Sequence, residues 1–400
     1  MMRSLFGIVL LSVFLFSMGV AGVAGDTLHS VDEEVISANT LFGFNLFSEL
    51  VREDAGKNVF ISPLSISIAL GMTYNGAAGK TQEAMAKALE LKGMKLEKIN
   101  PGYAGLMKGL KSSDPRVELL IANSLWARRE VEFEPDFLKR NKEFYKARIT
   151  TLDFADPGSP GVINKWVSEN TKGEIKKIVE QIDPQTVMFL INAIYFRGKW
   201  SCEFDKSRTK DDIFYLLDGT EKSVPMMSQS GRYQYYRGKG FQAVSLPYGD
   251  GRMSMYIFLP DEGSSLSDFL AGLNRENWGK WLPLFHYMEG DIRLPRFKLE
   301  YEKSLNNALE SLGMGIAFDP GKADFRGMSD TTLYIQSVLH KAVVEVNEEG
   351  TVAAAVTSVM MGITSVPERF TFIVNRPFFF AIHDNQTNSL LFMGAVVKPG

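Results

Sequence analysis

The chain has 400 residues and a formal net charge of −3, with 45% apolar and 23% charged residues. These values are ordinary for a globular protein with a sizeable core, and they exclude a disordered chain. A net charge this small gives no electrostatic reason to bind nucleic acid or an anionic membrane. Length alone would allow two or three domains, but no Ser/Gly/Pro-rich linker divides the chain. We therefore expect one large domain over residues 26–400.

The first 25 residues have the order of a secretory signal peptide. Arg3 precedes an apolar run from Leu5 to Val20, and small residues follow from Ala21 to Gly25. We expect residues 1–25 to be removed and the mature chain to be secreted, with no remaining membrane segment. The alternative is an uncleaved anchor, because the apolar run approaches membrane-spanning length.

Nothing in the sequence suggests catalysis, a metal or a cofactor. Cys202 is the only cysteine, so no intramolecular disulfide can form and the fold must depend on packing. The sequence contains no GxSxG or HExxH motif. The histidines, which lack metal-ligand spacing, are His29, His286, His340 and His383. We therefore expect a protein that is not an enzyme.

Helix signals dominate the start of the mature chain. Apolar residues recur every three or four positions over 35–50, which predicts a first helix that ends before Gly56. Residues 59–61 have the composition of a short strand. Ser62-Pro63 then supplies a helix cap followed by proline in the first turn, which predicts a helix over Leu64–Tyr74.

The middle of the chain favours strands. Val187–Phe196 is apolar apart from Asn192, as expected for a strand buried on both faces with one polar group that needs a partner. We identify His340 as the candidate partner. A hairpin is predicted over Ser245–Leu259, because Gly249-Asp250-Gly251 provides turn residues between two apolar segments.

The last third contains an uncharged window, Thr351–Val366, between predicted strands. It has no charge and no proline. Such a segment tends to aggregate, and acidic and proline residues at its borders oppose this. Small and β-branched side chains in its first half suit a strand. We interpret the window as a strand kept outside its sheet, with a buried strand or helix as the alternative. The flanking strands are predicted at Leu333–Ile335, Val338–Val346, Phe370–Val374 and Phe378–Ile382.

Several sequence blocks resemble the serpin family, in order and over most of the chain. NEEGTVAAA has the form of the serpin hinge, and NRPFFFAI followed by SLLFMGAVVKP has the form of the C-terminal strands. Further blocks resembling serpin signatures lie at 58–81, 163–179, 191–200 and 340–350. The resemblance implies an α+β fold in which several helices surround three β-sheets. It also implies a large central sheet and an exposed reactive-centre loop at about 350–367.

The resemblance implies a suicide-substrate inhibitor of serine proteases. A protease attacks one loop bond and forms an acyl-enzyme, and the cleaved loop then inserts into the central sheet and traps the enzyme. A charge or proline in the hinge would oppose insertion, and this hinge has neither after its acidic start. We therefore predict an inhibitory member, with a non-inhibitory carrier, chaperone or storage protein as the alternative. The hinge residues are Glu348, Glu349, Gly350, Thr351, Val352, Ala353, Ala354 and Ala355.

Family spacing from the hinge places the reactive bond at Thr364-Ser365, with Ile363-Thr364 as the alternative. Small β-branched or aliphatic residues suit the narrow apolar pocket of elastase- or subtilisin-like proteases. Trypsin-like targets are not expected, because no Arg or Lys lies between Thr351 and Arg369. Secondary cleavage by a chymotrypsin-like protease at Met360-Met361 remains an alternative. We therefore expect a serine protease as the partner. We expect the chain itself to be a monomer.

Two residue sets take a role from the resemblance. The first is the shutter beneath the central sheet, where strands part to admit the loop; its residues are Ser62, Ser65, Asn192 and His340. The second is the breach near the top of the sheet, where the hinge enters; its residues are Trp200, Arg296 and Glu348. The alternatives are a satisfied core histidine, core packing of the tryptophan, and a solvated Arg–Glu pair.

Overall fold

The first helix forms over the apolar stripe that the sequence predicts. A computed structural model of the chain describes residues 32–111, 114–350 and 368–400. Helix α1 (Glu33–Glu53) begins after Asp32, whose carboxylate accepts hydrogen bonds from the first-turn backbone. The predicted stripe forms the buried face of α1, and the helix ends before Gly56 as expected.

Helix α2 (Pro63–Tyr74) confirms the predicted cap. Ser62 Oγ accepts a hydrogen bond from the Ser65 backbone N–H at 3.3 Å, and Pro63 occupies the first turn. Every residue of α2 is buried, because the helix packs between α1 and the strands beneath it. The other helices are α3 (Gly79–Ala88), α4 (Leu96–Gly109), α5 (Pro135–Arg140), α6 (Ser159–Asn170), α7 (Leu266–Gly272), α8 (Arg275–Trp281) and α9 (Asn306–Leu309).

The described strands form two hydrogen-bonded sheets. We call the first the central sheet; its strand order is β10-β11-β4-β2-β3. Its pairing alternates, since β10–β11 and β4–β2 are antiparallel while β11–β4 and β2–β3 are parallel. Its strands are β2 (Val117–Arg128), β3 (Arg148–Leu152), β4 (Met188–Gly198), β10 (Phe297–Ser304) and β11 (Ser337–Val346).

We call the second sheet the outer sheet; its strand order is β1-β14-β13-β8-β7-β6-β9-β12, and β5 also pairs with β6. Its strands are β1 (Val59–Ile61), β5 (Lys210–Tyr215), β6 (Glu221–Gly238), β7 (Phe241–Tyr248), β8 (Met253–Pro260), β9 (His286–Pro295), β12 (Arg369–Ile373), β13 (Phe378–Asp384) and β14 (Ser389–Val396).

Two sheets are described where three are predicted, and β6 explains the difference. This strand pairs with β7 over Gln234–Gly238 and with β9 over Met226–Tyr235. One continuous strand therefore joins what would otherwise be two separate sheets. The predicted hairpin is confirmed as β7 and β8, and its turn glycines Gly249 and Gly251 both have positive φ angles.

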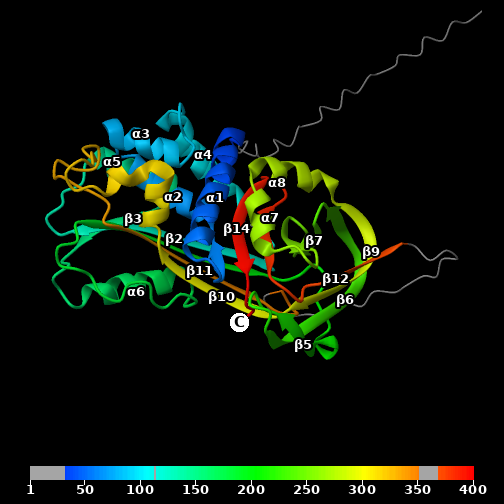
Figure 1. Ribbon diagram of the computed structural model, residues 1–400. Helices are drawn as coiled ribbons and strands as arrows, with labels where there is room; N and C mark the ends of the chain where they lie inside the picture. Colours follow the sequence, from blue (N-terminus) through cyan, green and yellow to red (C-terminus); the bar gives the residue numbers. More distant parts are fainter. Residues whose placement is uncertain (1–31, 112–113, 351–367) are drawn as a thin grey trace, which may run out of the picture. The chain divides into compact units, whose positions relative to one another are not determined.

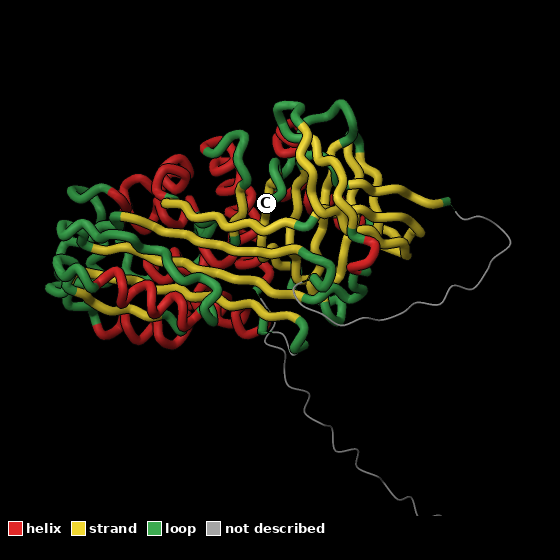
Figure 2. The backbone as a smooth tube through the Cα atoms, turned by 90° about the horizontal axis from the view of Figure 1, so that it is seen from below, coloured by secondary structure: helices red, strands yellow, loops and turns green. Residues whose placement is uncertain are grey.

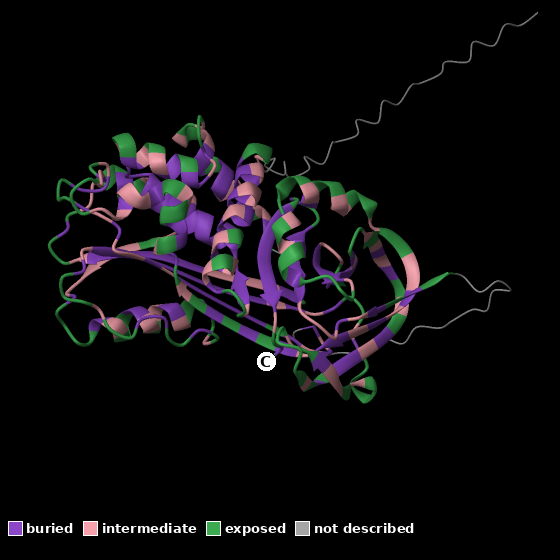
Figure 3. Cartoon of the chain, in the orientation of Figure 1, coloured by how far each residue is buried: buried purple, intermediate pink, exposed green. Residues whose placement is uncertain are grey.

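The two faces of the central sheet have different cover. Helices α1–α5 lie on one side and α6 lies on the other (Figure 1), and Figure 2 shows the strands of this sheet side by side, seen from the α6 side. A small apolar cluster, which includes Trp126, Ile163 and Phe189, fills the space beneath α6. The larger core joins the remaining helices to the outer sheet. Figure 3 shows buried residues along the strands of the central sheet.

One predicted strand is wrong. Leu333–Ile335 is apolar and its end residues are buried, but it pairs with no strand among the described residues. The Ile335 backbone N–H donates instead to the Ala317 carbonyl at 3.0 Å, and β11 begins only at Ser337. Burial of apolar side chains satisfies the hydrophobic pattern without a β-ladder.

The described residues lie within one compact unit of the chain, Val31–Gly400. No helix among them is both long and apolar enough to cross a membrane. The predicted signal peptide at 1–25 lies outside the described residues.

Candidate functional site: the hinge and the interior of the central sheet

A buried polar network joins the two parallel strands at the middle of the central sheet. His340 on β11 lies directly opposite Asn192 on β4, and its Nδ1–H donates to Asn192 Oδ1 at 2.6 Å. The Asn192 amide in turn donates to Ser65 Oγ on α2 and to Asn123 Oδ1 on β2. The predicted partner of Asn192 is therefore confirmed, and one side chain links β2, β4, β11 and α2.

The structure separates Ser62 from the other predicted shutter residues. Ser65, Asn192 and His340 meet in the network, whereas Ser62 caps α2 and reaches the network only through its bond to Ser65. Asn123 is a member that sequence reasoning missed. Its signal was a polar Asn-Ser pair within the apolar run of β2, but only the β2–β4 register places it opposite Asn192.

His340 is held in its neutral form. Its side chain is fully buried, and burial lowers its pKa to about 3. Because Asn192 Oδ1 can only accept, the His340 proton lies on Nδ1, and Nε2 has no hydrogen-bond partner among the described residues. Protonation of Nε2 would create an unpaired charge in the core, so the network is stable only with neutral histidine.

The two parallel strands separate at one end. The β4–β11 register runs from Phe189 opposite Ser337 to Tyr195 opposite Val343. Beyond this point the end of β11 continues to pair with β10, and the end of β4 with β2, but not with each other. The central sheet is therefore already parted beside the described part of the hinge.

Gly350 closes a tight turn at this parting. Its backbone N–H donates to the Asn347 carbonyl at 3.1 Å, and its φ angle is +86°. A Cβ at this position would lie 2.4 Å from both the Gly198 carbonyl oxygen and the Trp200 nitrogen. Only glycine fits here, so the last described hinge residue lies against the end of β4.

Trp200 also contacts the turn that Gly350 closes. Its indole Nε1–H donates to the Asn347 carbonyl at 3.0 Å, and its backbone N–H donates to the Glu349 carbonyl at 3.2 Å. The ring stacks on Tyr248 with centroids 4.3 Å apart. The predicted breach tryptophan is thus both a core residue and a direct contact of the hinge.

Glu348 is buried, so its pair with Arg296 is not the solvated one that the alternative interpretation supposed. Its side chain is 2% exposed and accepts from Arg296 Nε at 2.7 Å and from the Thr209 hydroxyl. Burial by itself would raise the pKa of Glu348, but the hydrogen bonds from Arg296 and Thr209 outweigh it and lower the pKa. The neighbouring Glu349 pairs with Lys206.

The rest of the predicted loop follows Gly350 in the sequence. Thr351 to Ala355 of the hinge and both candidate reactive bonds, Thr364-Ser365 and Ile363-Thr364, lie outside the described residues. Within the described ranges, no group of three or more His, Cys, Asp or Glu side chains could hold a metal ion. The described residues thus form a pair of strands, β4 and β11, that separate at one end, and the start of the hinge is held beside that end.

Comparisons with known proteins agree on one family. The family model described as "Serpin (serine protease inhibitor)" matches residues 37–399. Serpin B6 from Pongo abelii is 38% identical over 371 residues, covering 90% of this chain and 98% of that protein. Leukocyte elastase inhibitor from Bos taurus is 36% identical over 380 residues, covering 92% of this chain and 100% of that protein.

Solved structures give the same result. The native state of the thermophilic serpin tengpin has a TM-score of 0.85 and 37% identity, covering 92% of this chain and 95% of that one. Native protease nexin-1, solved with heparin, has a TM-score of 0.84 and 28% identity, covering 91% of this chain and 100% of that one.

Proposed function

Because the chain belongs to the serpin family, we propose that it is a suicide-substrate inhibitor that traps a serine protease as an acyl-enzyme. The protease cleaves the reactive-centre loop, and the hinge side of the cleaved loop inserts as a new strand between β4 and β11. The inserted strand carries the attached protease along the sheet, and distortion of the protease then stalls deacylation.

The observation that carries this proposal is the parted β4–β11 pair beside Gly350. A strand that leaves Gly350 and turns back between β4 and β11 would run antiparallel to both. It would replace one parallel ladder by two antiparallel ladders, which pair slightly better per residue. About thirteen inserted residues at roughly 3.3 Å each would form about 45 Å of strand.

The contacts at the hinge suggest how premature insertion is prevented. Glu348, Trp200 and Gly350 hold the turn at 347–350 against the end of β4. Deeper in the sheet, the Asn192–His340 hydrogen bond must break before a strand can pass between them. Insertion therefore requires that the hinge contacts at the breach and the Asn192–His340 hydrogen bond at the shutter break first. The hydrogen bonds of the inserted strand form only after both have broken.

We propose elastase- or subtilisin-like proteases as targets, with Thr364-Ser365 as the reactive bond. The uncharged, small-residue loop sequence supports this choice, and a similar protein carries the name leukocyte elastase inhibitor. We also propose that the chain is secreted, which rests on the signal-like order of residues 1–25. We propose further that it acts as a monomer. The second candidate is a non-inhibitory serpin, which proteases would cut without being trapped.

The test is to incubate the mature chain with pancreatic elastase and with a subtilisin. Denaturing gels and mass spectrometry then analyse the products. We expect a complex that survives SDS and a released fragment that begins at Ser365. Clean cleavage without a complex would contradict inhibition and favour the non-inhibitory alternative.

A matched loop variant sharpens the test. The double variant Ala353→Arg, Ala354→Arg leaves the reactive bond unchanged. Because neighbouring residues of a strand face opposite sides, it places a charge on the inward face of the segment that must become strand. The variant should be cleaved at the same bond at a similar rate while forming little complex. If the double variant trapped protease as well as the unmodified chain, insertion of the hinge would not be the trapping step.

A further inference from the structure

The sequence contains one N-glycosylation sequon, Asn385-Gln386-Thr387. It lies in the turn between β13, which ends at Asp384, and β14, which begins at Ser389. None of its residues belongs to the hinge or to the polar network of the central sheet. Asn385 is exposed, so its position by itself would allow a glycan. Whether it accepts one depends on the contacts of its amide.

Both polar atoms of the Asn385 side chain are hydrogen-bonded. One N–H of Nδ2 donates to the Gly251 carbonyl at 3.1 Å, and the other donates to Ser254 Oγ at 2.9 Å. Oδ1 accepts from the Tyr256 hydroxyl at 3.1 Å. The backbone N–H donates to the Arg252 carbonyl at 2.8 Å. All three N–H groups of Asn385 are therefore engaged.

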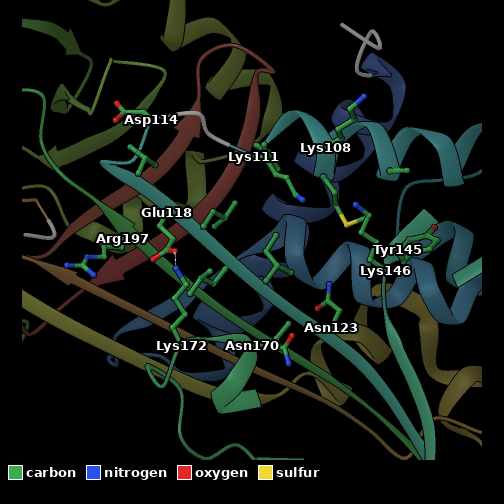
Figure 4. Close-up of a pocket in the computed structure, with 18 of the residues that line it drawn as sticks. Lys108, Lys111, Asp114, Glu118, Asn123, Tyr145, Lys146, Asn170, Lys172 and Arg197 are labelled. Carbon is green, nitrogen blue, oxygen red and sulfur yellow. Dashed lines mark hydrogen bonds and ion pairs between the residues drawn. The ribbon is translucent and has the colours of Figure 1, made fainter. Parts of the chain in front are cut away.

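These bonds join two hairpins, because all four partners belong to the β7–β8 hairpin. The β8–β13 ladder ends where Met253 lies opposite Asp384, and Asn385 continues the contact beyond this last pair through its side chain. The β7–β8 turn is also held from another element. Figure 4 shows Asp114 just before β2, and its carboxylate accepts from the Asp250 backbone N–H at 2.8 Å. Asn385 thus binds a turn that is itself fixed.

The neighbouring residues fix the sequon further. Asp384 is fully buried and forms an ion pair with Arg252 at 2.6 Å. Its Oδ1 accepts from the backbone N–H groups of Gln386 at 2.9 Å and Thr387 at 3.2 Å. The Thr387 hydroxyl donates to Ser389 Oγ at 2.9 Å. The hydroxyl of the sequon is therefore engaged as well as the amide.

Glycan transfer makes specific demands on Nδ2 of the acceptor. The nitrogen attacks C1 of the first sugar, the C1–O bond to the pyrophosphate of a lipid-linked donor breaks, and Nδ2 loses one proton. In the fold, both hydrogens of Nδ2 are directed to the β7–β8 hairpin. A sugar would have to replace one of them, so the bond to Gly251 or to Ser254 would be lost. The nitrogen is thus available only when the two hairpins are apart.

We propose that Asn385 accepts a glycan only before the β13–β14 turn docks on the β7–β8 hairpin, and that the folded chain is no substrate for an oligosaccharyltransferase. In the folded chain, Asn385 is a structural link between the two hairpins. A chain glycosylated at Asn385 would lack this link, so modification and complete folding exclude each other. The proposal does not rest on protease inhibition, and a failure of that function would leave it unaffected.

The test compares two substrates of one purified oligosaccharyltransferase, supplied with a lipid-linked oligosaccharide. The first is the folded mature chain, and the second is a synthetic peptide that covers residues 380–392. Mass spectrometry of the products measures glycan occupancy at Asn385. We expect the peptide to be modified at least about tenfold faster, because two hydrogen bonds must first break in the folded chain. Equal rates would overturn the proposal.

The matched control places the same kind of sequon in another hairpin turn. Asp218→Asn creates it before Gly219 and Thr220, in the turn between β5 and β6. Asp218 is exposed, and its Oδ1 accepts from the Thr220 backbone N–H at 3.0 Å and from the Thr220 hydroxyl at 2.6 Å. An amide keeps both bonds through its oxygen and does not need its nitrogen for them. The folded variant should therefore be glycosylated at position 218 and not at Asn385.

Two other outcomes of this control would overturn the proposal. Similar occupancy at the two positions would mean that the hydrogen bonds of Asn385 do not protect it. Absence of glycan at both positions would assign the protection to the fold as a whole rather than to these bonds.

A double variant tests the bonds directly. Ser254→Ala with Tyr256→Phe removes two partners of the amide and leaves the sequon unchanged. With its fold verified by circular dichroism, this variant should be glycosylated at Asn385 at least about fivefold faster than the unmodified chain. Ser264→Ala with Tyr287→Phe makes the same changes at exposed positions and should have no effect. Equal acceleration by the two pairs would overturn the role of these bonds.

Secretion from yeast gives a separate readout in a cell that glycosylates sequons. Secreted, folded chains should be unmodified at Asn385, and chains with a glycan there should remain in the retained fraction. Thermal unfolding compares the secreted protein with and without a glycan. A secreted chain that is glycosylated at Asn385 and unfolds at the same temperature as the unglycosylated chain would overturn the proposal.

Discussion

The two sheets of this protein are held together by different kinds of contact. On one face of the outer sheet, the Phe258 ring of β8 lies 5.7 to 5.9 Å from the rings of Phe241 and Phe379 on the two neighbouring strands. It also lies 5.5 to 6.1 Å from four rings on and after the covering helices α7 and α8, which are Phe269, Trp278, Trp281 and Phe285. In the central sheet, the adjacent parallel strands meet at Asn192 and His340, whose contact is a hydrogen bond. One sheet is closed by aromatic packing and the other by a polar network.

The difference teaches which sheet can open. Aromatic packing is non-directional and spread over many neighbours, so separating those strands would expose much apolar surface at once. A hydrogen bond can be exchanged for another one, and its net contribution is small as long as both groups find new partners. For the proposed insertion, a sheet closed by polar side chains is therefore easier to open, and the following predictions test this comparison.

The largest expected effect is in the outer sheet. Phe258→Ala should lower the free energy of unfolding by about 3–5 kcal/mol, because it removes a fully buried ring from tight packing. Denaturant unfolding of the mature chain measures the change. The control is Leu217→Ala, whose side chain is 53% exposed and whose loss should cost within about 0.5 kcal/mol. Similar costs for the two variants would contradict the role of Phe258 in the core.

A smaller effect is expected in the central sheet. Asn192→Ala leaves Ser65, Asn123 and His340 without their shared partner, and it should cost about 2–3 kcal/mol. The three contacts act as a unit, so adding His340→Ala to this variant should cost much less than His340→Ala alone. A double-mutant cycle measures the coupling. Additive costs would show that Asn192 and His340 act independently.

The smallest effect is a pH dependence of the same network. The pKa of His340 is lowered to about 3, so at a pH between that value and about 6.5 the unfolded chain binds a proton that the folded chain does not. Stability should therefore fall as the pH is lowered through this window, by about 2 kcal/mol at pH 5 from His340.

The control for this dependence is a variant without the titrating ring. His340→Asn should lose the part of the acid destabilisation that His340 causes. His383 is also buried with a lowered pKa, so its contribution has the same sign, remains in both proteins and cancels in the difference. If the unfolding free energy changed with pH in the same way in the two proteins, His340 would not be held neutral in the fold.

Local patterns predicted much of this molecule. The stripe over 35–50, the cap at Ser62 and the turn at Gly249-Asp250-Gly251 were all predicted, because each depends on residues close together in the chain. The strand predicted over Leu333–Ile335 is wrong because that prediction, too, used only residues close together in the chain. Its apolar pattern reports burial, and only distant residues decide whether a buried segment also pairs as a strand.

The candidate site shows where local information ends. The sequence indicates that Asn192 needs a partner and that residues 351–366 can pair as a strand, since both properties follow from side-chain chemistry within one segment. Asn123 and the early end of the β4–β11 ladder follow from pairings between strands far apart in the chain. The sequence by itself determined those elements that depend on neighbouring residues, and the side-chain chemistry of each segment. Only the tertiary structure decided which strands are neighbours and where they part, because register depends on long-range packing rather than on local periodicity.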